Sequence, residues 1–121
     1  MIKTVHDLEV YEISFELAME IFRLTRKFPK EEKYSLSDQI VRSSRSVPVN
    51  IREGFAKRNY EKIFIRQLIT AIGSSEETRC WLKFSSECGY ITKKEFKYYD
   101  KKYDRINAMI YKLYTNWQNY S

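Results

Sequence analysis

The sequence predicts an all-α fold: one antiparallel, up-down-up-down four-helix bundle domain over residues 1–121, with its second helix kinked at Pro48. Only three glycines and two prolines occur in the 121 residues, fewer than the turns of a sheet protein this long would need. Near the C-terminus, apolar residues recur in an unbroken heptad rhythm. A chain of this length can bury about 65% of its unfolded surface, which is enough for one core without disulfides or metals.

The first helix is expected over residues 7–27, where two apolar stripes run in parallel. One bundle face needs a single stripe, so this helix is either unusually well buried or also faces another subunit. The helix ends before Pro29, which disfavours α geometry at Phe28. The first stripe is Leu8, Tyr11, Phe15, Ala18 and Phe22, and the second is Val10, Ile13, Leu17, Ile21 and Leu24.

The second helix is expected to begin at Ser35, which precedes Asp38 at the spacing of a capping box. Its apolar pattern continues past Pro48 through Ile51 and Phe55. Proline removes one helical hydrogen bond and crowds the preceding turn. We therefore expect a kink at this position, with the helix continuing beyond it.

A polar stripe lies beside the apolar face of the second helix. It could bind a substrate, but it holds no nucleophile beside a base. We therefore favour a structural network between helices or subunits, with Arg42 facing Glu53 or Glu77, which would set specificity more than stability. The stripe includes Ser46, and the residues assigned to the network are Gln39, Arg42, Asn50, Glu53 and Glu77.

The last two helices have clearer boundaries. Asn59 is expected to cap a helix over residues 60–88, and Gly89 to end it. Thr92 and Glu95 have capping-box spacing at the start of the fourth helix. The heptad seam of that helix is Phe96, Tyr99, Tyr103, Ile106, Ile110, Leu113, Trp117 and Tyr120, whereas Tyr98 and Tyr111 fall outside it.

Several functions are not expected from this sequence. Cys80 and Cys88 would lie about 12 Å apart along one helix, too far for a disulfide. No apolar run spans a membrane and no signal peptide opens the chain, so we expect a cytoplasmic protein with no membrane partner. His6 is the single histidine, with no arginine near it and no Glu-x-x-His pair. We expect no metal, no cofactor and no enzymatic activity.

Basic residues exceed acidic residues by 22 to 16, a formal net charge of +6, which favours an anionic partner. On the fourth helix the bases occupy an arc of about 80° opposite the heptad seam. Such a strip is either a solvated face or a contact for phosphates, and no base-specific motif accompanies it. The candidate nucleic-acid-binding residues are Arg45, Arg52, Lys57 and Arg58, together with Lys94, Lys97, Lys101, Arg105 and Lys112.

Residues 36–54 read LSDQIVRSSRSVPVNIREG. This stretch resembles the four-helix bundle proteins encoded in intervening sequences of bacterial 23S ribosomal RNA genes, whose pattern is roughly L..QI.R...S.P.NI.EG. Arg45 and Arg52 depart from the family, in which small or apolar residues are usual there. Further matching residues are Asp7-Leu8, Val10-Tyr11, Phe28-Pro29, Ile72-Gly73-Ser74, Glu77 and Gly89-Tyr90-Ile91.

The resemblance implies a four-helix subunit that commonly assembles as a ring of five. Similar proteins are accessory factors of reverse transcriptases in diversity-generating retroelements, where a basic pentamer binds nucleic acid and the polymerase.

Three classes of function are considered for this chain. The first is a nucleic-acid-binding accessory protein, with RNA or DNA as its ligand and a reverse transcriptase as a possible partner. The second is a purely structural or protein-binding oligomer, and an enzyme is the weakest of the three.

Overall fold

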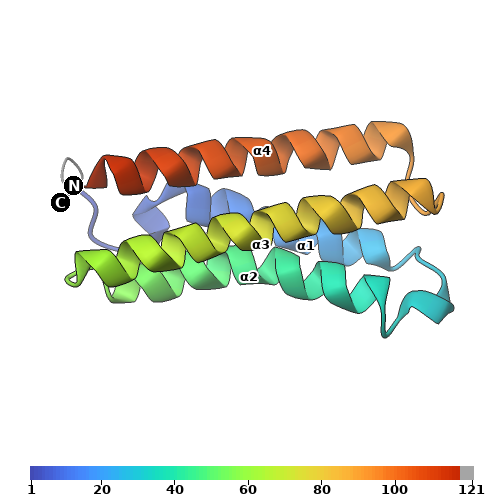
Figure 1. Ribbon diagram of the computed structural model, residues 1–121, viewed down its shortest axis with the longest axis horizontal. Coiled ribbons are helices and arrows are strands. Elements are labelled where there is room, and N and C mark those ends of the chain that lie inside the picture. Colours follow the sequence, from blue (N-terminus) through green and yellow to red (C-terminus); the bar gives the residue numbers. More distant parts are fainter. Residues whose placement is uncertain (118–121) are drawn as a thin grey trace.

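The computed structural model describes residues 1–117 and confirms the four-helix bundle. Its helices are α1 (Glu9–Thr25), α2 (Leu36–Ala56), α3 (Glu61–Glu87) and α4 (Lys93–Thr115), and two 3-10 turns, η1 (Val5–Asp7) and η2 (Lys30–Glu32), precede α1 and α2. Successive helices run in opposite directions and are joined by short turns (Figure 1). Tyr120, which was predicted to extend the α4 seam, lies outside the described residues.

Two predicted helix ends are confirmed with their capping contacts. The Glu95 amide donates to the Thr92 hydroxyl at 3.0 Å, and the Thr92 amide donates to the Glu95 carboxylate at 2.9 Å, which completes a capping box. Gly89 follows α3 with φ 76°, a conformation that favours glycine. The Tyr90 amide then donates to the Ser85 carbonyl at 2.9 Å, as in a Schellman motif.

The predicted capping box at Ser35 is wrong. The Ser35 hydroxyl donates to the Glu32 carboxylate at 2.6 Å and makes no capping hydrogen bond to α2. The same carboxylate accepts the Leu36 amide at 3.4 Å. The Ser35 amide, which Asp38 was expected to bind, donates to the backbone carbonyl of Glu32 at 3.0 Å instead.

Two helices begin slightly later than predicted. Asp7 belongs to turn η1, where its carboxylate accepts the Thr4 amide at 2.9 Å, so α1 starts at Glu9. The residue that precedes α3 is Tyr60, so the predicted cap at Asn59 is wrong. These shifts of one or two residues leave the core positions in place.

The predicted core faces are largely confirmed. The α4 seam from Tyr103 to Leu113 is at most 6% exposed, whereas Tyr98 and Tyr111 are 46% and 58% exposed. On α1 the second stripe is mostly buried, but Phe15 of the first stripe is 49% exposed. α2 continues through the buried Pro48, as predicted, and the kink itself stays a prediction.

An interhelix ion-pair cluster joins α3 to α4. The Arg79 guanidinium contacts both carboxylate oxygens of Asp100, at 2.8 and 3.2 Å. It also lies 2.9 Å from Glu76 and 3.3 Å from Asp104. Hydrogen bonding to Asp100 is the largest cause of the raised pKa of Arg79. Because the guanidinium bonds both carboxylate oxygens, the contact fixes the orientation of Arg79 against Asp100.

We expect Arg79→Met to lower the free energy of unfolding by about 1 kcal/mol, because three neighbouring carboxylates lose their shared cation. The side chain is only 25% exposed, so the pair is less screened than a surface pair. Arg23→Met is the matched control: Arg23 and Glu16 are 56% and 66% exposed, and the loss should be near zero. If urea unfolding gives equal losses of unfolding free energy for the two variants, the cluster stabilises the fold no more than an exposed ion pair does.

Candidate nucleic-acid interface

The five predicted cations of α4 form one exposed strip on its outer surface, opposite the buried seam. Within residues 1–117, no carboxylate lies within 4.0 Å of any of their charged groups. The strip therefore presents its positive charge to solvent without compensation from a bonded acid. The residues of this α4 strip are Lys94, Lys97, Lys101, Arg105 and Lys112.

The acidic residues of α4 point toward its neighbouring helices instead. Glu95 contacts Lys27 of α1 at 2.7 Å, and this hydrogen bond is the largest cause of the lowered pKa of Glu95. Asp100 and Asp104 are both held by Arg79 of α3. The packing thus neutralises the acids at the flanks of α4 and leaves the bases on its outer face.

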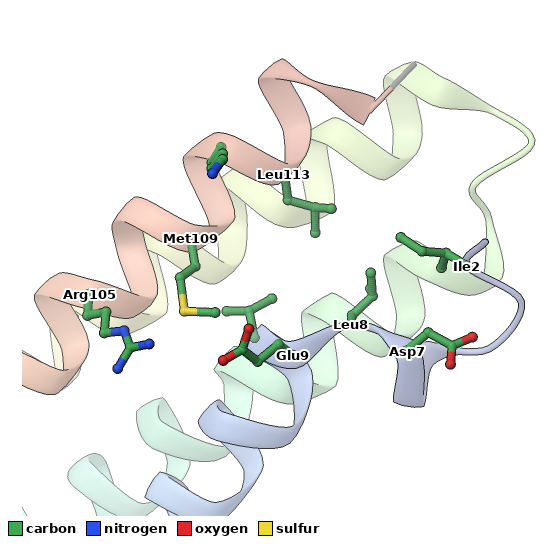
Figure 2. A pocket seen from close by; sticks show the side chains of 9 residues that line it. Ile2, Asp7, Leu8, Glu9, Arg105, Met109 and Leu113 are labelled. Carbon is green, nitrogen blue, oxygen red and sulfur yellow. The ribbon is translucent and has the colours of Figure 1, made fainter. Parts of the chain in front are cut away.

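A hollow of about 400 Å³ adjoins the C-terminal half of the strip, between α4 and the start of α1. Figure 2 shows Arg105 and Met109 of α4 on one side, with Glu9 and Asp7 beyond them. Because carboxylates line this hollow together with the bases, an anion inside it would meet both signs of charge. The outer face of the strip is therefore better suited to phosphates than the hollow is.

The predicted cations of α2 separate into two groups. Arg45 and Arg52 lie on the side facing α1, with their guanidinium carbons 5.3 Å from the Phe22 ring and 5.7 Å from the Tyr11 ring. Since Arg105 and Lys112 reach the start of α1 from α4, α1 lies between the two basic surfaces. The structure therefore does not bring the α2 and α4 cations into one continuous patch.

Lys57 and Arg58 stand at the end of α2 and are already engaged. Lys57 lies 3.5 Å from the Glu53 carboxylate and 3.3 Å from the Gln67 side-chain oxygen. The Arg58 guanidinium lies 4.0 Å from the centre of the Phe55 ring and donates to the Phe55 carbonyl. Among these four predicted cations, only Arg45 and Arg52 are both exposed and without a carboxylate within 4.0 Å in residues 1–117. They are therefore the better candidates for contact with an anion.

Part of the predicted polar network joins α2 to α3. The Gln67 amide donates to the Asn50 side chain at 3.1 Å, and the Ser46 and Ser74 hydroxyls lie 2.8 Å apart. The sequence pattern identified Asn50 and Ser46 but missed their α3 partners, because a contact between two helices depends on their relative register.

The other members of the polar network lie on the surface of the subunit. Arg42 lies 3.7 Å from Asp38, whereas it was expected to face Glu53 or Glu77. Glu77 accepts the indole N–H of Trp81 at 3.0 Å, and Gln39 is exposed. A role for these side chains between subunits stays a prediction.

Within the described residues, no group of three or more His, Cys, Asp or Glu side chains is placed to hold a metal ion. No helix in the described part of the chain is both long and apolar enough to cross a membrane. Cys80 and Cys88 are both exposed free cysteines.

The four-helix arrangement and the polar pattern of α2 agree with a known family. The family model for the 23S rRNA-intervening sequence protein matches residues 6–112. The chain belongs to this family. The matched region of the intervening sequence protein family includes all of the candidate cations on α2 and α4, and it confirms the resemblance carried by residues 36–54.

A solved structure supports the same assignment. It is a protein of unknown function from the S23 ribosomal protein family of Bacteroides thetaiotaomicron VPI-5482, and it is 29% identical to this chain with a TM-score of 0.79. The match covers 88% of this chain and 95% of that one. Comparison with proteins of curated function finds no match.

Proposed function

We propose that this member of the intervening sequence protein family is a non-catalytic, basic homo-oligomer that binds nucleic acid through the phosphate backbone. The observation that carries the proposal is the α4 strip, whose five cations have no bonded carboxylate among residues 1–117. From Lys94 to Lys112 the strip extends about 27 Å along the helix. Phosphates repeat every 3.4 Å or so along one strand of a duplex, so several can be contacted at once.

Binding to two duplexes of unrelated sequence tests this proposal. We expect fluorescence anisotropy at about 50 mM salt to give similar affinities for both, because contacts to phosphates carry no sequence information. RNA and DNA duplexes should both be tried. If the unmodified protein binds neither at this salt concentration, the strip is a solvated face and the structural oligomer becomes the better interpretation.

The α3 outer face, made of Ile69, Gly73, Cys80 and Phe84, supports the homo-oligomeric part of the proposal. These residues are spaced by four, seven and four, so they share one side of the helix, and Ile69 and Phe84 are each 51% exposed. A Cβ atom at Gly73 would meet nothing within 4 Å, so another helix could approach closely there. This face equally favours the second candidate function, a protein-binding oligomer without a nucleic-acid role.

We expect a pentamer in light scattering on a size-exclusion column, the assembly that the family resemblance implies. A ring would repeat the α4 strip once per subunit, and linked weak sites reinforce one another. A stable monomer near 14.7 kDa at micromolar concentration would exclude the oligomer. A dimer would exclude the ring.

The proposed cellular role is that of an accessory factor, with a reverse transcriptase as the protein partner and the cytoplasm as the compartment. The support is the resemblance to retroelement accessory proteins together with the basic surface. A reverse transcriptase gene beside this gene, and co-purification of the two products, are the expected observations. A gene placed inside a ribosomal RNA gene, with no such partner, would argue for a different role.

A further inference from the structure

An apolar hollow of about 290 Å³ lies between α1 and α2, and no residue of the α4 strip lines it. Two of its apolar side chains are exposed to solvent: Phe15 is 49% exposed and Val49 is 56% exposed. Ala18, a small residue on α1, leaves the space that a larger side chain would fill. The hollow is lined by Tyr11, Phe15, Ala18, Met19, Pro48 and Val49, with Arg45 and Arg52 beside them.

The two arginines are held in place by aromatic rings. Arg52 donates to the Tyr11 hydroxyl at 2.9 Å and lies over its ring, and Arg45 lies over the Phe22 ring. Neither guanidinium has a carboxylate within 4.0 Å in the described part of the chain. Each arginine carries five N–H donors, so most of them stay available to an anion.

This arrangement defines the chemistry of the occupant. Arg45 and Arg52 are seven residues apart, about 10.5 Å along α2, with the apolar floor between them. A matching ligand therefore carries a flat, largely apolar group between two anionic groups. A nucleotide within a strand has this chemistry, because its base is attached to a sugar that is flanked by two phosphates, and the base can stack on aromatic side chains.

We propose that the α1–α2 hollow binds one base of single-stranded RNA or DNA, with the flanking phosphates on Arg45 and Arg52. The inference rests on the proposed nucleic-acid binding and deepens it, because the two basic surfaces then prefer different substrates. The α4 strip accepts any phosphate backbone. The hollow requires an unpaired base, since the bases of a duplex are stacked and paired in its interior.

The test compares a 20-nucleotide single strand with a 20-base-pair duplex, using Phe15→Ala to remove the exposed aromatic ring. Stacking of one base on such a ring strengthens binding by roughly 5- to 150-fold. We expect Phe15→Ala to weaken single-strand binding within this range and to change duplex binding less than about twofold. Tyr60→Ala is the matched control, because Tyr60 is 69% exposed and does not line the hollow.

Val49→Glu is the second variant, since it places a negative charge beside the hollow at a position that is already exposed. It should repel a single strand more strongly than a duplex. A strand carrying 2-aminopurine gives an independent readout: its fluorescence should change on binding the unmodified protein and stay constant with Phe15→Ala. Equal effects of Phe15→Ala on single strand and duplex, or no effect on either, would overturn the inference.

The outcomes separate the failure of this inference from failure of the proposed function. If duplex binding is present and is lost on charge reversal of the α4 strip, while Phe15→Ala leaves single-strand binding intact, only the hollow has been assigned wrongly. If neither nucleic acid binds, both proposals fall. If Phe15→Ala changes the mass in light scattering and leaves nucleic-acid binding intact, a second copy of the chain occupies the hollow and the base does not.

Discussion

Replacing Lys97, Lys101 and Arg105 together by glutamate is expected to weaken duplex binding by roughly 100-fold at low salt. Each lost phosphate contact removes about one released counterion, so the slope of log affinity against log salt should become shallower by about 2.7. All three side chains are exposed and opposite the buried seam. Helical content and oligomer mass should therefore be unchanged.

The control for this variant carries the same change of charge elsewhere. Lys3, Lys30 and Lys33 are exposed positions outside the four helices, and their replacement by glutamate also lowers the formal net charge by six. If affinity depends on the α4 strip, this control should keep most of its binding and most of its salt slope. Equal losses in both triple variants would mean that net charge alone attracts nucleic acid, with no specific strip.

Gly54→Ala is expected to destabilise the bundle by about 1–3 kcal/mol, because α2 and α3 approach closely at this residue. A Cβ atom at Gly54 would lie 2.8 Å from the Gln67 Cβ and 3.2 Å from the Phe64 ring. A neighbouring Cβ is fixed to its backbone and cannot rotate away, so the two helices must separate. Urea unfolding of the variant measures the loss of unfolding free energy. An unchanged midpoint would contradict a close approach of α2 and α3 at Gly54.

Gly73→Ala is the matched substitution without a close neighbour. It lies in the interior of α3, and a Cβ there meets nothing within 4 Å. Replacement should raise the stability of the subunit by about 0.5–1 kcal/mol, because alanine is the better helix former. If the α3 outer face is a subunit contact, the same variant should also reduce the oligomer mass.

The features that were predicted correctly from sequence depend only on residues close together in the chain. The heptad seam around Tyr103 depends on spacing along one helix, and the capping box of Thr92 on a separation of three residues. The end of α3 depends on the left-handed backbone of Gly89, which glycine adopts without strain. Each of these features could be recognised without knowing how the helices pack.

The errors arise where a second segment competes or contributes. Ser35 matched a capping pattern, but its hydroxyl donates to the carboxylate of Glu32 in the preceding turn. No sequence pattern marks the Arg79 cluster, because its partners Asp100 and Asp104 lie on another helix. Arg42 was assigned a distant partner although Asp38, one turn before it on the same helix, lies nearer.

For the candidate interface, the exposure of the α4 strip could be predicted from sequence, but the surroundings of the α2 cations could not. Wheel positions on α4 predicted the exposed strip, since one helix determines which bases share a face. They could not predict that Arg45 and Arg52 lie against α1, because this depends on where Tyr11 and Phe22 meet α2. The hollow beside these arginines follows from the packing of Ala18 near Pro48, which no periodic pattern reveals.

The salt dependence of duplex binding by the unmodified protein tests the central claim most directly. Affinity for one 20-base-pair DNA duplex would be measured by anisotropy from about 50 to 300 mM salt. If the five cations of the α4 strip each contact a phosphate, log affinity should fall linearly with log salt, with a slope near −4.5 for a single strip. A slope shallower than about −1, or no binding at 50 mM, would contradict the assignment of this surface to nucleic acid.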